Sequence, residues 1–382
     1  MSATRIVVLG YIVRGPLGGL AWHHLQYCIG LANLGCDVLF LEDSDDYPSC
    51  YDPCRHSVSE NPSYGLHFAN ETFSAIGLDE AWAYHDHHTG RWLGPAARSA
   101  PEFCANADIM LNVSGVNPAR PWLGDIPVRV FIDTDPVFTQ IRSLTEPDFR
   151  ALIDWHTAHF TFGELVAAGR SRVPDDGIAW KATRQPVALD CWQYGVGPDH
   201  APFTTVMQWQ SYRGRAFAGV TYGMKSESFG NVMDLPQSSP VGLEIALGGE
   251  EAPRDRLRAH GWRITDPLSV TRTIDSYQQY LRDSMGEFSV AKEGYVTGRS
   301  GWFSERSAAY LASGRPVVTQ DTGFGELFEV GRGLLAYRTA EEALDALVNV
   351  AGDYTKHCVA AREVARSHFN ADIVLENLLS EL

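Results

Sequence analysis

The sequence predicts an α/β protein made of two doubly wound domains, each with a parallel sheet covered by helices. The chain has 382 residues, which is long for a single hydrophobic core. Its first half opens with a strand, a helix and a second strand, and its second half alternates strands and helices over roughly 130 residues. A composition of 45% hydrophobic and 20% charged residues, with 10 Trp, is typical of a well-packed globular protein.

The first half is predicted to begin with a buried strand, a glycine-rich loop, a helix and a second strand, at residues 5–11, 15–19, 21–34 and 37–41. The loop lacks the G-x-G-x-x-G spacing of nicotinamide and flavin dinucleotide sites. Gly18 and Gly19 therefore either let the loop approach some other ligand closely or simply turn the chain.

Two histidines in the first turns of the predicted helix are candidates for general-base chemistry. His23 and His24 can accept a hydroxyl proton near neutral pH. The positive end of the helix dipole would lower the pKa of the imidazole and so keep it in the neutral form that accepts a proton. Neighbouring helical positions point about 100° apart, so we expect at most one of them, His23, to face a ligand. A packing role for each histidine is the alternative.

A later strand, predicted at 128–132, ends in two carboxylates, Asp133 and Asp135. Because the carboxyl ends of parallel strands meet at one edge of a sheet, both should lie near the loop that carries Gly18 and Gly19. Either carboxylate can orient the histidine or act as the base itself, and Asp133 is our catalytic candidate. Capping the next segment is an equally consistent role.

Three stretches contain residues that commonly bind metals, at 42–46, 50–56 and 85–88. Carboxylates suit Mg²⁺ or Mn²⁺, and the two cysteines with a histidine in the second stretch suit zinc. However, acidic residues at a strand end are a common solvated loop, the cysteine spacing is loose, and consecutive residues cannot all converge on one ion. We therefore predict no metal site.

A Gly- and Pro-rich passage at 195–202 marks the boundary between the two domains, which we place between residues 198 and 199. The second domain is predicted to alternate strands and helices, with strands at 204–209, 243–249, 262–265 and 288–292 and helices at 255–260 and 274–285. Lys225, which follows a glycine, is a single cation in a region with few others.

Residues 299–324 show the clearest pattern of a ligand site. A turn at Ser300 and Gly301 leads to a helix with Ser304 as its N-cap candidate, then to a strand at 317–319 that ends in a polar glycine loop. In open α/β sheets ligands bind at the carboxyl ends of strands, and a helix N-terminus reached by a glycine turn favours phosphate. An ordinary helix–strand unit with a tight turn is the alternative.

This segment resembles the donor-binding motif of nucleotide-sugar glycosyltransferases with the two-domain GT-B fold. The resemblance rests on Gly301-Trp302-x-Ser304, a small-residue helix, Gly314-x-Pro316-Val317-Val318 and Gln320-Asp321. It implies two Rossmann-like domains that face a cleft, with a final helix that crosses back to the first domain. The acceptor-side domain would comprise residues 1–198 plus about 362–382, and the donor-binding domain residues 199–361.

The resemblance also implies roles for single residues. His23 or Asp133 would remove the acceptor proton, and Lys225 would neutralise charge on the leaving diphosphate. Acceptor specificity would come from the irregular, aromatic stretch at 47–100. The donor would be bound by Gly18, Gly19, Lys225, Arg299, Ser300, Gly301, Trp302, Ser304, Glu305, Arg306, Asp321, Thr322 and Gly323.

The chain departs from the family pattern at two positions. Many retaining members carry a glutamate near the position of Ala309, where it holds the donor ribose, and here Glu305 stands about one helical turn earlier. Arg299 occupies the place of a family histidine, so Arg299 or Arg306 is expected to supply that phosphate contact. Retaining chemistry is therefore not implied.

The function implied is transfer of a sugar from a nucleoside-diphosphate sugar, most readily a UDP-sugar, to a small-molecule or glycan acceptor, with no cofactor or metal required. Two alternatives stay open: a nucleotide-sugar epimerase or hydrolase on the same fold, and a non-catalytic nucleotide-sugar-binding partner protein. A formal net charge of −16 argues against nucleic acid and anionic membranes as partners. Seven scattered cysteines, with no visible signal peptide or membrane span, predict a cytoplasmic protein.

Overall fold

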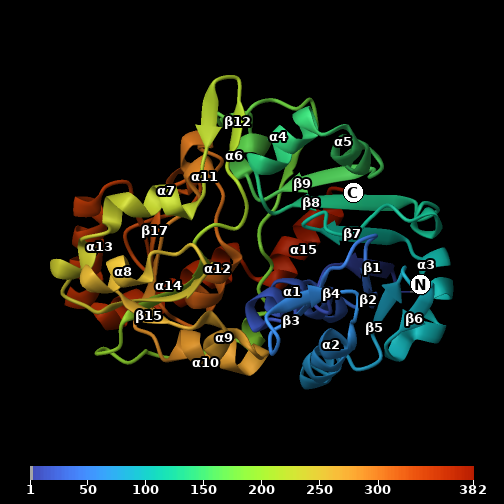
Figure 1. Cartoon of the computed structure of the whole chain (residues 1–382), viewed down its shortest axis with the longest axis horizontal. Helices are drawn as coiled ribbons and strands as arrows, with labels where there is room; N and C mark the ends of the chain where they lie inside the picture. The colour runs from blue at the N-terminus through green and yellow to red at the C-terminus, as the bar shows by residue number, and fades with distance from the viewer. Residues whose placement is uncertain (1–2) are drawn as a thin grey trace.

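The computed structural model describes residues 3–382 and has two halves, each built on a largely parallel sheet with helices around it (Figure 1). The predicted α/β fold class is confirmed. The sheet of the first half has the strand order β10 (Lys181–Ala182), β9 (Ala158–Thr161), β8 (Val128–Asp133), β7 (Ile109–Val113), β1 (Arg5–Leu9), β2 (Asp37–Asp43), β5 (Trp82–Asp86) and β6 (Arg91–Leu93). Its strands pair in parallel except for β5 and β6, which are antiparallel.

The sheet of the second half is parallel throughout. Its strand order is β15 (Arg263–Thr265), β14 (Leu243–Gly248), β11 (Phe203–Gln208), β16 (Gly286–Ser289), β17 (Val317–Gln320) and β18 (Leu334–Tyr337). In each sheet the strand order reverses at the first strand of that half, β1 or β11, and the crevice beyond such a reversal is where open α/β sheets bind ligands.

Helices cover both sheets. Those of the first half are α1 (Gly18–Asn33), α2 (Ser63–Ala75), α3 (Ala100–Ala105), α4 (Phe138–Thr145), α5 (Pro147–Asp154) and α6 (Glu164–Ala167). Those that follow are α7 (Lys225–Phe229), α8 (Arg254–Ala259), α9 (Pro267–Thr271), α10 (Ile274–Arg282), α11 (Glu293–Gly298), α12 (Glu305–Ala312), α13 (Ala340–Gly352), α14 (Tyr354–His368) and α15 (Ala371–Ser380).

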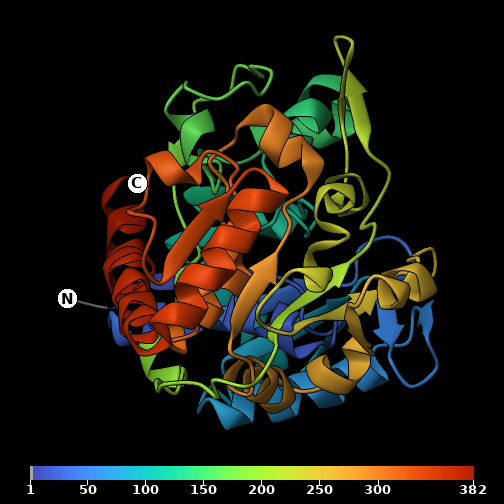
Figure 2. The same ribbon diagram turned by 90° about the vertical axis from the view of Figure 1, so that its left-hand side faces the viewer.

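Two short antiparallel ribbons stand outside the sheets, β3 (Cys50–Asp52) with β4 (Ser57–Ser59) and β12 (Arg215–Phe217) with β13 (Val220–Tyr222). No element is predicted from the sequence for the second ribbon, and Lys225 begins α7 shortly after it. This hairpin projects from the second half toward α4 (Figures 1 and 2), where Arg215 pairs with Glu146 at 2.7 Å.

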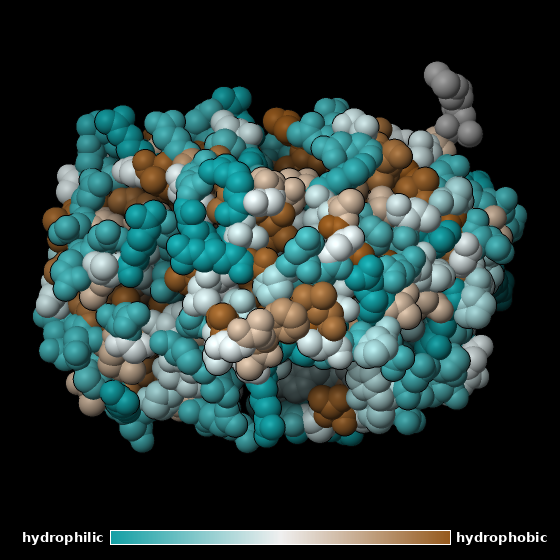
Figure 3. Space-filling model, turned by 90° about the horizontal axis from the view of Figure 1, so that it is seen from above, coloured by the Kyte–Doolittle hydropathy of each residue, from teal (hydrophilic) through white to brown (hydrophobic). Residues whose placement is uncertain are grey.

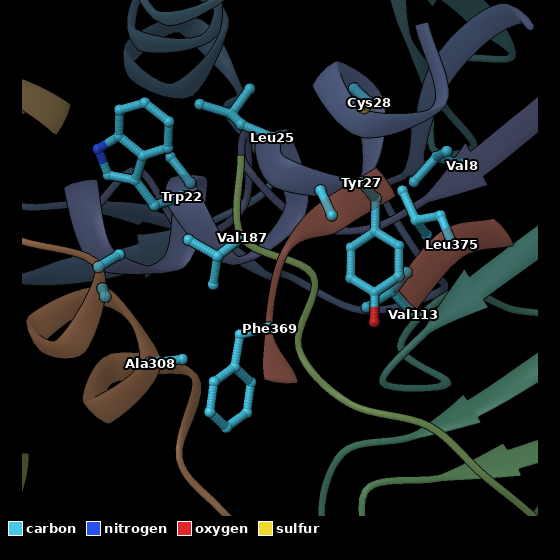
Figure 4. Close-up of a cluster of buried hydrophobic side chains, with 14 of the residues drawn as sticks. Val8, Trp22, Leu25, Tyr27, Cys28, Val113, Val187, Ala308, Phe369 and Leu375 are labelled. Atoms are coloured by element: carbon cyan, nitrogen blue, oxygen red, sulfur yellow. The ribbon is translucent and has the colours of Figure 1, made fainter. Parts of the chain in front are cut away.

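The final helix crosses back to the first half, as predicted. Helix α15 packs on α1 so closely that a β carbon on Gly30 would lie 2.5 Å from Leu375. The backbone N–H of Val187 donates to the carbonyl of Phe369 at 2.6 Å. Figure 4 shows Trp22, Val187 and Ala308 around one buried cluster, so one apolar cluster contains residues of both halves.

The two sheets are connected by residues between Ala182 and Phe203, and we propose that the domain boundary lies at 198–199 within this connection. The face seen from above in Figure 3 carries hydrophobic residues scattered among hydrophilic ones. Within residues 3–382, no helix has the length and apolar character needed to cross a membrane.

Candidate active site

A cavity of about 1490 Å³ lies between the two halves, where the carboxyl ends of their strands face each other. We call it the interdomain cavity. From the first half it is lined by residues of α1 and of the loops after β7 and β8, including Gly19, His23, Ser114 and Asp135. From the second half it is lined by residues after β11, β14 and β16 and by the start of α12, including Gln208, Gly248, Lys225, Lys292, Trp302, Ser304, Glu305 and Arg306.

The start of α12 lines this cavity with Ser304, Glu305 and Arg306. Ser304 is the N-cap: its backbone is extended and its hydroxyl accepts a hydrogen bond from the amide of Arg306 at 3.2 Å. The remaining first-turn amides and the helix dipole make this end favourable for an anion. Ser300 and Gly301 form the turn before it, and Gly301 adopts φ +76°, a conformation that glycine accepts without strain.

Arg306 is a buried cation held in a fixed orientation. Its Nε donates to the fully buried Glu287 at 2.6 Å, and its Nη1 donates to the carbonyl of Val206 at 2.9 Å. These two bonds use Nε and Nη1, which leaves Nη2 for another partner. The planar, forked guanidinium matches the geometry of a phosphate. Glu287 is not among the site residues predicted from the sequence. Glu287 lies within β16, behind the cavity, and no local sequence pattern marks such a position.

Lys225 lies at the start of α7, half-buried, and lines the same cavity. Burial, together with the positive charge of Arg306, lowers its pKa to about 7. It forms no ion pair with any residue from 3 to 382. Among residues 3–382, Lys225 is thus a second basic group near Arg306 that no ion pair engages, although the carboxylate of Glu305 acts on it from the same cavity wall. Two basic groups on one wall suit a multiply charged anion.

His23 faces the cavity from α1. Its Nδ1 lies 2.5 Å from Oε1 of Gln185, and its Nε2 lies 3.3 Å from the hydroxyl of Ser114. The amide nitrogen of Gln185 donates to the carbonyls of His23 and Pro186, so the amide oxygen must face the imidazole. Nδ1 therefore carries the proton and Nε2 is the basic nitrogen.

Burial lowers the pKa of His23, which keeps the imidazole neutral. His24 is fully buried and does not line the cavity; its ring packs edge-on against Tyr11, 5.0 Å between centroids. Of the two histidines, only His23 lines the cavity, and its role toward a ligand stays a prediction.

The structure does not place Asp133 in the cavity, which corrects its assignment as a base. The carboxylate is buried and accepts hydrogen bonds from the hydroxyls of Thr139 and Thr161, each at 2.7 Å, and from Gln140 at 3.0 Å. Burial raises its pKa to about 6. Asp133 therefore fixes the turn that follows β8.

Asp135, two residues later, is the carboxylate that lines the cavity. It pairs with Lys292 at 2.8 Å and accepts hydrogen bonds from the hydroxyls of Tyr212 and Tyr295. Lys292, Tyr212 and Tyr295 belong to the second half, so this cluster joins the two halves across the cavity. Lys292 follows β16 directly, a position from which sequence reasoning could have found it, whereas no signal distinguished Tyr212.

The loop residues Asp321, Thr322 and Gly323 do not line the cavity either. Asp321 pairs with Arg338 at 2.7 Å and accepts from the amide of Gly323 at 2.8 Å. The hydroxyl of Thr322 donates to the carbonyl of Trp302 at 2.5 Å. This loop braces the turn before α12, so its contribution to a ligand site is indirect.

Arg299 and Gly18 are also placed differently from the expectation. Arg299 pairs with Glu326 and is not a cavity residue. Gly18 faces α10: a β carbon there would lie 2.1 Å from the carbonyl oxygen of Thr273, so only glycine allows α1 and α10 to pack this closely. Gly19, Trp302 and Glu305 do line the cavity, and Trp302 packs on Tyr295 with 4.4 Å between ring centroids.

No protein-family model and no curated protein sequence matches the chain. Solved structures do match over nearly the whole length of both chains. An alpha-glucosyltransferase in complex with UDP and a 13-mer DNA is 10% identical, with a TM-score of 0.58 and 99% of each chain covered. AviGT4, a glycosyltransferase involved in avilamycin A biosynthesis, is 13% identical, with a TM-score of 0.55 over 98% of this chain and 96% of its own.

HepE from Anabaena, in complex with UDP and glucose, is 12% identical, with a TM-score of 0.57 over 99% of this chain and 100% of its own. At these identities the similarity concerns the fold. The chain has the GT-B fold, the two-domain architecture of nucleotide-sugar glycosyltransferases, and this prediction is confirmed.

Proposed function

We propose that the protein is a glycosyltransferase that moves a sugar from a nucleoside-diphosphate sugar to an acceptor hydroxyl. One observation carries the proposal: Lys225 and Arg306 line the interdomain cavity together with the first turn of α12, and Lys225 forms no ion pair among residues 3–382. A diphosphate supplies the missing negative charge. UDP is the nucleotide we favour, because structures of the same fold contain it.

The base in this proposal is Nε2 of His23. It would accept the proton of the acceptor hydroxyl as the oxygen bonds to the anomeric carbon. The bond between that carbon and the diphosphate oxygen breaks in the same reaction, and the leaving diphosphate keeps the bonding electrons. Lys225, Arg306 and the amides of α12 would stabilise the charge that develops there.

The proposed donor site is smaller than the sequence-based set. Gly19, Lys225, Trp302, Ser304, Glu305 and Arg306 would contact the donor, since they line the cavity. Gly18, Arg299, Ser300, Gly301, Asp321, Thr322 and Gly323 would act by supporting the loops and helix ends around it.

A nucleic-acid acceptor is not part of the proposal, although one structure of the same fold contains DNA. The formal net charge of −16 opposes binding to a polyanion. A gel-shift experiment with a DNA duplex at low salt tests this directly: a shifted band that high salt removes would contradict it.

We also propose a cytoplasmic location, because the seven cysteines are free in the structure and free thiols are typical of a reducing compartment. The described residues include no cluster of three or more His, Cys, Asp or Glu arranged to hold a metal. Whether transfer needs a divalent cation is decided by assays with EDTA and with Mg²⁺ or Mn²⁺.

The first experiment is a thermal-shift panel of UDP, TDP, GDP, ADP and their sugars. At a hundredfold excess over the dissociation constant, a ligand stabilises by about 2.7 kcal/mol, which is readily measured. A selective shift with UDP compounds supports the proposal, and no shift with any nucleotide, with or without metal, overturns it. Hydrolysis or epimerisation of the bound sugar without an acceptor would point to the other enzyme classes.

A further inference from the structure

A second cavity, of about 940 Å³, opens from the interdomain cavity into the first half. The two cavities share the wall residues Tyr11, Ser114, Val116, Arg142 and Phe149. The hydroxyl of Ser114 lies 3.3 Å from Nε2 of His23, so the basic nitrogen stands where the two cavities meet. A molecule in the second cavity can therefore present one end to that nitrogen. We call this second cavity the side groove.

The side groove has apolar walls. One wall is the segment 45–58, where Tyr47 and Val58 are exposed by 57% and 58%. The opposite wall is α5 with the residue after it, which contribute Phe149, Leu152 and Trp155. With Tyr11, the groove has four aromatic residues, and aromatic rings in a groove of this volume suit a flat, apolar ring system of drug-like size.

Both arginines that line the side groove are already engaged in ion pairs. Arg14 pairs with Glu42 at 3.2 Å, and Arg142 pairs with Glu146 at 3.0 Å while its guanidinium covers the ring of Phe149 at 3.6 Å. The groove also contains the carboxylates of Asp45 and Asp148. Because both arginines of the side groove are already paired, neither is available to an acidic ligand. The walls of the groove therefore favour an uncharged molecule over a polyanion.

We propose that the side groove binds the acceptor and that the acceptor is an uncharged molecule with a flat, apolar ring system and a hydroxyl at one end. This inference rests on the proposed transferase function only in calling the ligand an acceptor. Binding of such a ligand in the side groove does not depend on that function. Continuity with the cavity at Ser114, aromatic walls and paired arginines together favour this class over a polyanion such as DNA, and the experiment compares it with an oligosaccharide and an acyl chain.

The experiment measures binding without a donor. The probes are planar uncharged phenols, with 4-methylumbelliferone and naringenin as examples, and the comparison ligands are maltose, decyl maltoside and a DNA duplex. Each is titrated by calorimetry into wild type, Val58→Glu and Val348→Glu. Val348, on α13, is a matched control because it is a valine exposed by 52% that does not line the groove.

We expect at least one phenol to bind the wild type and the Val348→Glu variant equally. Its dissociation constant should rise at least about tenfold in Val58→Glu, because a carboxylate would be placed against an apolar ring. Binding of no phenol, or equal binding to both variants, overturns the proposal. So does Val58→Glu-sensitive binding of maltose, decyl maltoside or DNA in place of the phenols.

A UDP thermal shift on the same three proteins separates this proposal from the transferase proposal. UDP should stabilise all three alike, because neither Val58 nor Val348 lines the interdomain cavity that contains Lys225 and Arg306. If phenol binding responds to Val58→Glu while UDP stabilises none of the proteins, the groove stands as a ligand site and the transferase proposal falls.

Discussion

Lys225 gives the most direct test at the scale of single residues. In the unliganded protein, burial and Arg306 lower its pKa to about 7. A bound diphosphate would raise that pKa, because a nearby opposite charge favours the ammonium form. Binding above pH 7 must then take up a proton, so the affinity for UDP should fall from pH 7 to 9, by up to about tenfold per unit.

The Lys225→Met variant should bind UDP at least about tenfold more weakly at pH 6.5 and lose this pH dependence. Calorimetry in two buffers of different ionisation enthalpy measures both the dissociation constant and the proton uptake. Lys356→Met, at an exposed position of α14, serves as the control. A wild-type affinity that does not change between pH 7 and 9 would contradict the role given to Lys225.

His23 and Gln185 make a second residue-scale prediction. Removing the base in His23→Asn should lower kcat about 100-fold or more and leave the UDP dissociation constant unchanged. Burial lowers the pKa of His23 below its usual value, and activity needs the neutral form. Activity should therefore be lost only as the pH falls through that lowered pKa, below pH 6.5.

Gln185→Glu separates a positioning role from a purely structural one. A carboxylate beside Nδ1 favours the imidazolium, which raises the pKa of His23, so the acidic limb of the rate profile should move to higher pH. Gln185→Leu should lower kcat without moving the limb in that direction. If the limb stays in place in Gln185→Glu, His23 is not the group that the profile reports.

The turn after β8 shows why neighbouring carboxylates were assigned incorrectly from the sequence. Asp133 and Asp135 both follow a buried strand, and alternate residues at a strand end look alike in a sequence. Only the fold shows that Thr139, Gln140 and Thr161 enclose the first carboxylate. Its partners on α4 and β9 become neighbours through tertiary packing, which no local pattern encodes.

At the scale of elements, this turn predicts a stability effect in place of a catalytic one. Asp133→Asn replaces one acceptor oxygen with a donor and leaves at least one buried donor without a partner. The free energy of unfolding should fall by about 2 kcal/mol, and kcat of the folded protein should stay within a few-fold of wild type. Urea denaturation with a kinetic assay measures both. A loss of kcat comparable to that of His23→Asn would restore Asp133 as a catalytic candidate.

Other elements were predictable to different extents. The strands β1, β2 and β11 and the helix α12 follow from apolar runs and a cap serine, and their predicted bounds lie within a few residues of those observed. The β12–β13 hairpin was missed, because its apolar residues pack on α4 of the other half and not on a sheet. Lys225, at the start of α7 after this hairpin, nevertheless lines the cavity.

At the scale of the whole molecule, the continuous core makes the two halves depend on each other. The cluster that contains Trp22 of α1 also contains Ala308 of α12 and Leu375 of α15 (Figure 4). Trp22 donates to the carbonyl of Ile274 on α10 at 3.2 Å, which adds a polar contact across the same interface. A core shared in this way predicts that the halves unfold together.

Calorimetry of the full chain should therefore show one transition, with equal calorimetric and van 't Hoff enthalpies.

Gly30→Leu, which places a large side chain against Leu375 and Ala371, should lower the melting temperature of that single transition by several degrees, because the clash separates α15 from α1. The control is Asn33→Leu at the end of α1, which adds bulk without backbone strain. Gly35→Leu is unsuitable as a control, because the φ of +79° at Gly35 strains any other residue. Two resolved transitions in the wild type would show that the shared core does not couple the halves, and the site between them would then be formed by independent units.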